Sequence, residues 1–152
     1  MKRRLFALAL ALLLAVSLPV SALAATWYLE DGDITIRATE NGQYVSQGDK
    51  HDVKDDDPTI SQNDSSTSTS NTITIDAEKD ATANVTLDGV NIVIDNTWEH
   101  QGTAGIRTTG EGNVTIELDG ENSVKSAVRA AGLQKENGGN LTIKDNNATA
   151  GK

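Results

Sequence analysis

The sequence predicts an all-β fold in which short parallel strands wind into a parallel β-helix, a β-solenoid of about three turns. The first observation behind this prediction is an internal repeat. Residues 104–116 match residues 131–143 at an offset of 27, with small residues, apolar residues and a Gly-Asn pair in register. A second match, at offsets of 29 to 31, links residues 84–91 to residues 113–122. These matches define three units, which span residues 72–102, 103–129 and 130 onward.

The second observation is the spacing of apolar side chains inside each unit. They alternate with polar residues over three to five positions between Gly, Asn and Asp turns, which is typical of strands, and no helical spacing follows residue 24. The alternating residues are Ile73 and Ile75, Val85 and Leu87, Ile92 and Ile94, Val114 with Ile116 and Leu118, and Leu141 with Ile143. Stacked turns need only one or two inward side chains per strand, and equivalent Asn and Thr residues can form ladders.

The third observation is a composition that an ordinary globular core does not explain. Leu, Ile, Val and Phe make up 23 of the 128 residues after Ala24, about 18%, a content at which a highly charged chain is expected to be disordered. The chain has no cysteine, so disulfides cannot replace a core. A narrow solenoid core resolves this difficulty. Two alternatives stay open: an antiparallel sandwich, which requires no constant offset, and a disordered or molten chain.

Residues 1–24 have the features of a secretory signal peptide. A basic start is followed by an apolar run from Leu5 to Val16 and by a cleavage site of small residues at Ala22 to Ala24. The run of about 12 residues is too short to cross roughly 30 Å of hydrocarbon as a helix. We therefore expect a secreted or cell-surface protein without a membrane segment after cleavage. Removal of the signal leaves ten basic and 22 acidic side chains, a net charge of −12.

The mature chain divides into three parts in this interpretation. Residues 25–46 contain strand and turn signals and are predicted to form an N-terminal β cap, whereas residues 47–71 lack an apolar period and are predicted to be a polar loop or linker. Residues 72–152 carry the β-helix repeats. Few residues follow the last predicted strand, and solenoids normally cover an open parallel edge with a cap. We therefore expect a truncated chain, with a tail folded over the end as the alternative.

Four segments resemble the repeats of the carbohydrate-binding, pectate-lyase-like surface proteins of Gram-positive anaerobes. The segments are Ser70-Asn-Thr-Ile-Thr-Ile75, Ala83-Asn-Val-Thr-Leu-Asp-Gly-Val-Asn-Ile92, Gly112-Asn-Val-Thr-Ile-Glu-Leu-Asp-Gly-Glu-Asn122 and Gly138-Gly-Asn-Leu-Thr-Ile143. The resemblance covers roughly residues 27–147, and it implies a right-handed parallel β-helix that is exported and binds sugars or acidic polysaccharides, with or without calcium. It does not imply catalysis.

Candidate contacts to a glycan are the aromatic residues, because the faces of sugar rings pack against flat apolar surfaces. Trp98 lies with His100 in a polar insertion between two predicted strands, and it is the first candidate. His100 and Tyr44 complete the predicted carbohydrate-binding set. For each aromatic residue the competing interpretation is simple packing within its own loop or strand.

The candidate metal ligands are Asp55, Asp56 and Asp57, since Ca²⁺ takes six to eight oxygen ligands. Their spacing matches neither an EF-hand nor the nonapeptide repeat of calcium-binding β-rolls, so a solvated loop is the competing interpretation. His51 and His100 are far apart in the sequence, and no zinc site is expected.

The predicted function is therefore non-catalytic binding of a polysaccharide, such as a pectic or cell-wall glycan, on a lateral face and its loops. Arg107 and Arg129 occupy non-equivalent repeat positions without paired carboxylates, so an enzyme is not expected. The acidic charge argues against nucleic acid and anionic membranes as partners. The alternatives are a structural or adhesin stalk and a degenerate polysaccharide lyase.

Overall fold

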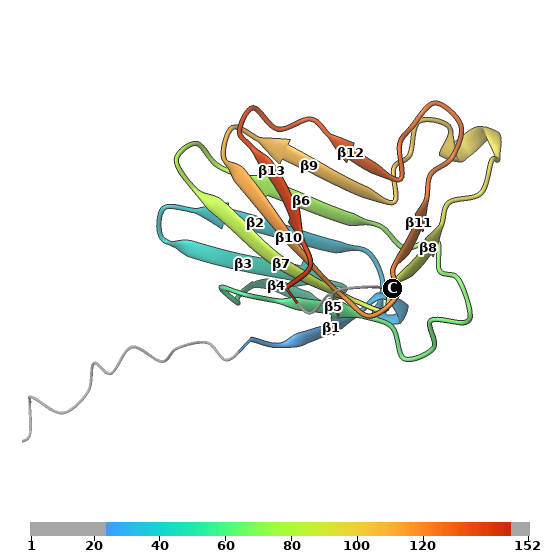
Figure 1. Ribbon diagram of the computed structural model, residues 1–152, viewed down its shortest axis with the longest axis horizontal. Helices are drawn as coiled ribbons and strands as arrows, with labels where there is room; N and C mark the ends of the chain where they lie inside the picture. Colours follow the sequence, from blue (N-terminus) through green and yellow to red (C-terminus); the bar gives the residue numbers. More distant parts are fainter. Residues whose placement is uncertain (1–23, 147–152) are drawn as a thin grey trace, which may run out of the picture.

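The computed structural model describes residues 24–146, and in these residues the chain is an all-β solenoid of about four turns (Figure 1). Two single 3-10 turns are its helical elements, η1 (Leu29–Asp31) and η2 (Trp98–His100). The strands are β1 (Thr26–Tyr28), β2 (Ile34–Thr39), β3 (Gly42–Gln47), β4 (Lys50–Lys54), β5 (Thr59–Ser61), β6 (Ile73–Ala77), β7 (Thr82–Asp88), β8 (Asn91–Val93), β9 (Ile106–Gly110), β10 (Asn113–Asp119), β11 (Ser123–Lys125), β12 (Leu133–Lys135) and β13 (Leu141–Lys144).

Successive turns contribute strands to three sheets. Sheet A has the order β1-β5-β7-β10-β13, with every pair parallel. Sheet B has the order β12-β9-β6-β2-β3-β4; it is parallel from β12 to β2 and is extended by the antiparallel hairpin β3–β4. Sheet C pairs β8 with β11 in parallel, and Thr69 bridges to β8 from the turn before. The predicted β-solenoid is confirmed.

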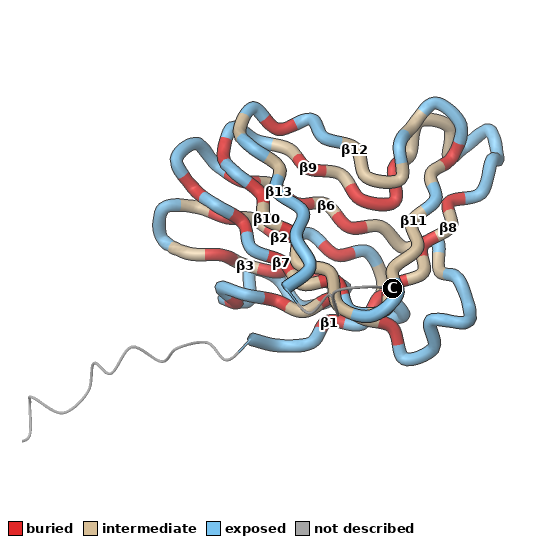
Figure 2. Tube along the Cα trace, in the orientation of Figure 1, coloured by how far each residue is buried: buried red, intermediate tan, exposed pale blue. Residues whose placement is uncertain are grey.

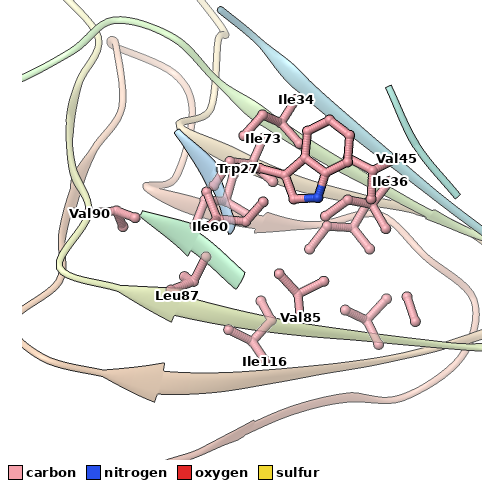
Figure 3. Close-up of a cluster of buried hydrophobic side chains, with 14 of the residues drawn as sticks. Trp27, Ile34, Ile36, Val45, Ile60, Ile73, Val85, Leu87, Val90 and Ile116 are labelled. Carbon is pink, nitrogen blue, oxygen red and sulfur yellow. The ribbon is translucent and has the colours of Figure 1, made fainter. Parts of the chain in front are cut away.

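Parallel pairing in register stacks the inward side chains into rows along the coil. In sheet B one row is Ile34, Ile73, Ile106 and Leu133; in sheet A one row is Val85, Ile116 and Ile143. The inward and outward alternation appears along each turn in Figure 2, and the buried side chains meet between the sheets in Figure 3. Because each strand needs to contribute only one to three inward side chains, a chain with few apolar residues can still fill its interior.

The first turn differs from the prediction. Residues 25–46 do not form a separate cap, because β1 and β2 pair in parallel with β5 and β6 as members of the coil. Residues 47–71 are not a plain loop, since they contain β4 and β5. The hairpin β3–β4 lengthens this turn to 39 residues in sheet B, counted from Ile34 to its register partner Ile73, and so hides the repeat. About four turns therefore replace the predicted three.

One register also differs from the sequence match. Asp88 pairs with Asp119, at the matched offset of 31, but Asn84 pairs with Thr115 and not with Asn113. The offset of 29 is therefore wrong for this strand, because β7 and β10 pair at one constant offset of 31 from Thr82 and Asn113 to Asp88 and Asp119.

The predicted signal peptide lies almost entirely in residues 1–23, outside the described residues. Within residues 24–146, neither helical turn is long and apolar enough to cross a membrane.

Candidate functional site

The connection between β8 and β9 carries the most exposed large apolar side chain reported for the described residues. Trp98 begins η2 in this connection, and 84% of its surface is accessible. Indole groups are mostly buried because water contact with their large apolar surface is unfavourable. An exposed tryptophan on a loop is therefore an informative observation, and here we call residues 94–104 the Trp98 loop.

A compact hydrogen-bond network holds the Trp98 loop in shape. The Asp95 carboxylate oxygen Oδ1 lies 2.5 Å from His100 Nδ1 and accepts a hydrogen bond of 2.9 Å from the Thr97 hydroxyl. The His100 backbone N–H also donates to the Thr97 carbonyl. His100, predicted as a glycan contact, is thus engaged in orienting its own loop. Asp95 is not among the residues predicted from the sequence, although the Asp95-Asn96-Thr97 run is a recognisable Asx-turn signal.

The next turn of the coil supports the Trp98 loop from one side. Asn96 Oδ1 accepts a hydrogen bond of 2.9 Å from the Val128 N–H, and the Val128 carbonyl accepts one from Gly102. Val128 itself is 44% exposed. The loop is therefore anchored internally and to its neighbour, so the backbone that carries Trp98 has little freedom left to lose on binding.

The pH dependence of this network follows from Asp95. The hydrogen bond from His100, followed by that from Thr97, holds the pKa of Asp95 below its usual 3.8. A carboxyl with a lowered folded-state pKa stabilises the fold above 3.8, and this contribution is lost as the pH falls through the lower folded-state value. We expect the indole N–H resonance of Trp98 to shift in this acid range in NMR spectra. Asp95→Asn should lack that transition, and an identical shift in both proteins would contradict the assignment.

Tyr44 lies elsewhere, on the outer face of sheet B. The Arg37 guanidinium lies over the Tyr44 ring, 5.4 Å from the ring centroid. Arg37 also forms an ion pair of 3.2 Å with Asp52. In Figure 1, β3 and the gold helical turn η2 stand on opposite sides of the molecule. The structure therefore brings Trp98 and His100 together and leaves Tyr44 as a separate aromatic position.

The three consecutive aspartates do not act as one group. Asp55 is buried and accepts hydrogen bonds from the Trp27 indole at 2.9 Å and from the Ala25 N–H at 3.1 Å. Asp56 accepts from the Gln43 N–H at 3.0 Å. In residues 24–146 no group of three His, Cys, Asp or Glu side chains is arranged to hold a metal ion. The solvated-loop interpretation is also incomplete, because Asp55 is a buried structural anchor.

A shallow hollow of about 260 Å³ lies on the outer face of sheet A. Its lining combines carboxylates, an amide, a hydroxyl and an amine, from Asp56, Asp57, Asn84, Thr115, Glu117 and Lys144. Glu117 and Lys144 form an ion pair of 3.3 Å within it. The hollow offers polar groups without an aromatic platform, so it is a secondary candidate surface.

Comparison of the chain with protein-family models, with curated proteins and with solved structures finds no match. The function is therefore inferred from the residues and geometry of the solenoid itself.

Proposed function

We propose that the protein is a secreted or cell-surface carbohydrate-binding β-solenoid that holds a polysaccharide without cleaving it. In this proposal it belongs with the right-handed, pectate-lyase-like surface proteins that its repeats resemble, and its ligand is a pectic or other wall glycan. The observation that carries the proposal is the Trp98 side chain, 84% exposed on a hydrogen-bonded loop.

The chemistry of the Trp98 loop suits a sugar ring. The apolar face of a pyranose packs on an indole while its hydroxyl groups need nearby donors and acceptors. Asp95 and Glu99 supply carboxylates beside Trp98, with side-chain exposure of 59% for Asp95. A long polymer could add weaker contacts along the polar outer faces of the sheets, including Tyr44, and each further contact would raise the avidity.

The proposal predicts that Trp98→Ala weakens binding to a wall glycan by about tenfold or more, because one ring-stacking contact is lost. Binding is measured by affinity electrophoresis and isothermal titration calorimetry with a panel of glycans. Trp98→Phe keeps an aromatic face and should retain part of the affinity.

Val53→Ala provides the matched control, because Val53 is an exposed apolar residue on β4, away from the Trp98 loop. This control should bind as the unmodified chain does. Equal binding by Trp98→Ala and Val53→Ala would remove the loop from the site, and absence of binding to every glycan by the folded chain would overturn the proposed function.

A structural stalk is the second candidate. The observation that favours it is the pair of apolar rows that continue through successive turns to the last strands, an arrangement that extends by repetition. A folded chain that binds no glycan in the same panel would support the stalk.

A further inference from the structure

The Trp98 loop ends at a second hollow, which lies on the outer face of sheet B. This hollow has a volume of about 270 Å³, and its lining comes from Thr72, Ile73, Thr74, Thr103, Ala104 and Arg107. Thr103 and Ala104 are the last residues of the Trp98 loop, and the gold chain in Figure 1 continues from them into β9. The loop that presents the indole therefore also forms one wall of this hollow, which we call the Arg107 hollow.

Parallel pairing places two polar side chains of the Arg107 hollow next to each other. Thr74 on β6 is the register partner of Arg107 on β9. Ile73 and Ile106, the residues just before them, are buried in the core, so the side chains of Thr74 and Arg107 project outward. Adjacent strands lie about 4.8 Å apart, so a single sugar ring can contact both side chains.

The polar groups of the Arg107 hollow are available to a ligand. The Arg107 side chain is 42% exposed, and its ionic contact is Glu136, whose Oε1 lies 3.8 Å from Arg107 Nε. This separation is too long for a hydrogen bond, so the guanidinium donates none to residues 24–146. The hydroxyls of Thr74 and Thr103 also have no hydrogen-bond partner within these residues. The hollow thus offers a planar set of donors beside two hydroxyls that both donate and accept.

The charges around the Arg107 hollow favour an uncharged ligand. Asp33 accepts a hydrogen bond of 3.1 Å from the Thr72 hydroxyl, and Glu136 lies 3.8 Å from Arg107. A third carboxylate, that of Asp76, lies on the outer face of β6. An anionic sugar would meet these three carboxylates as well as the single guanidinium, on a chain with ten basic and 22 acidic side chains after residue 24. Neutral hydroxyl groups meet no such repulsion.

We propose that the Arg107 hollow is a second sugar subsite, which holds a neutral unit of the same glycan chain that stacks on Trp98. The guanidinium donates hydrogen bonds to two adjacent hydroxyl oxygens of the sugar ring, and the hydroxyls of Thr74 and Thr103 bond the neighbouring ones. This inference rests on the proposed function. It adds the direction of the ligand, from the Trp98 loop onto sheet B, and its chemical class, an uncharged glycan segment.

Calorimetric titration with neutral glucose and galactose oligosaccharides of increasing length tests this subsite. Arg107→Ala is expected to weaken binding of the longer oligosaccharides by about tenfold, because the bonds from a charged donor are lost. Lys125→Ala is the matched control, since Lys125 is a cation in the hollow on sheet C, beside the start of the same loop. This control should bind as the unmodified chain does, and circular dichroism verifies that both variants are folded.

A second pair of variants removes a hydroxyl without changing the charge. Thr74→Val should weaken binding by about threefold, whereas Thr35→Val should leave it unchanged. Thr35 is the register partner of Thr74 in the preceding turn, and it lies outside the hollow. Oligogalacturonate of the same length, which carries a carboxylate on every unit, should bind more weakly than the neutral oligosaccharides.

The outcomes separate the subsite from the proposed function. If Trp98→Ala weakens binding and Arg107→Ala does not, the subsite is wrong and the proposed function stands. Weaker binding by Lys125→Ala in place of Arg107→Ala, or tighter binding of oligogalacturonate than of the neutral oligosaccharides, would also overturn the subsite alone. If the folded chain binds no glycan at all, both proposals are wrong.

Discussion

Gly112→Ala is expected to destabilise the solenoid by about 3 kcal/mol, at the upper end of the range for overpacking. An added Cβ at Gly112 would lie inside van der Waals contact with the backbone carbonyls of Glu78 and Ala81 in the preceding turn. Rigid backbone of a neighbouring turn cannot move aside without breaking the ladder. Chemical denaturation followed by circular dichroism measures the loss.

Gly138→Ala is the matched control for this prediction. The nearest atom to an added Cβ at Gly138 is the Glu111 Cα at 3.5 Å, an ordinary contact, so the stability should change by less than about 1 kcal/mol. Equal stability of Gly112→Ala and Gly138→Ala would contradict the close approach of the turns at Gly112.

Asp55→Ala is expected to destabilise the N-terminal turn by about 3 kcal/mol, because it leaves the buried Trp27 indole N–H without its acceptor and opens a space beneath it. Asp55 and Trp27 are 1% and 5% exposed, and their hydrogen bond is 2.9 Å long. Trp27 closes the end of the apolar interior beside Val45 and Ile36 (Figure 3). Hydrogen exchange should show faster opening of β1 to β4 than of β9 and β10.

Asp55→Asn separates hydrogen bonding from charge. The amide oxygen can still accept from the indole, so this variant should recover most of the stability lost in Asp55→Ala. Val53→Ala, an exposed substitution on β4 two residues before Asp55, should be close to neutral. An unchanged exchange pattern in Asp55→Ala would show that Asp55 does not hold the N-terminal turn.

The repeat predicted the later turns because their geometry is regular. Val114 and Leu141, like Ile106 and Leu133, are register partners at the matched offset of 27. The repeated Gly-Asn pair also has a physical cause. Gly139 lies against the backbone of Gly112, just as Gly112 lies against the backbone of Glu78 and Ala81 in the turn before. In addition, Asn113 Oδ1 accepts a hydrogen bond of 2.9 Å from the Asn140 N–H. The Gly-Asn pair therefore recurs in the sequence because each turn makes the same backbone contacts with the turn before it.

The first turn and the surroundings of the candidate site could not be predicted from the sequence repeat. The inserted hairpin breaks the period, so β1 and β5 have no sequence match despite their parallel pairing. Asp55 lies in a segment with the composition of a solvated loop, and only the folded structure shows that its carboxylate accepts a hydrogen bond from the Trp27 indole. The sequence identified Trp98, but its exposure and the support from Val128 depend on how two turns stack.

The unequal lengths of the turns have a practical consequence for redesign. The turn from Ile34 to Ile73 is 39 residues long, whereas the turn from Ile106 to Leu133 is 27 residues long. All four residues nevertheless occupy the same inward row. Segments that leave the coil between strands can therefore change in length while the row stays in place. The Trp98 loop is such a segment, so grafting a different sequence between β8 and β9 offers a route to new binding specificities on an unchanged scaffold.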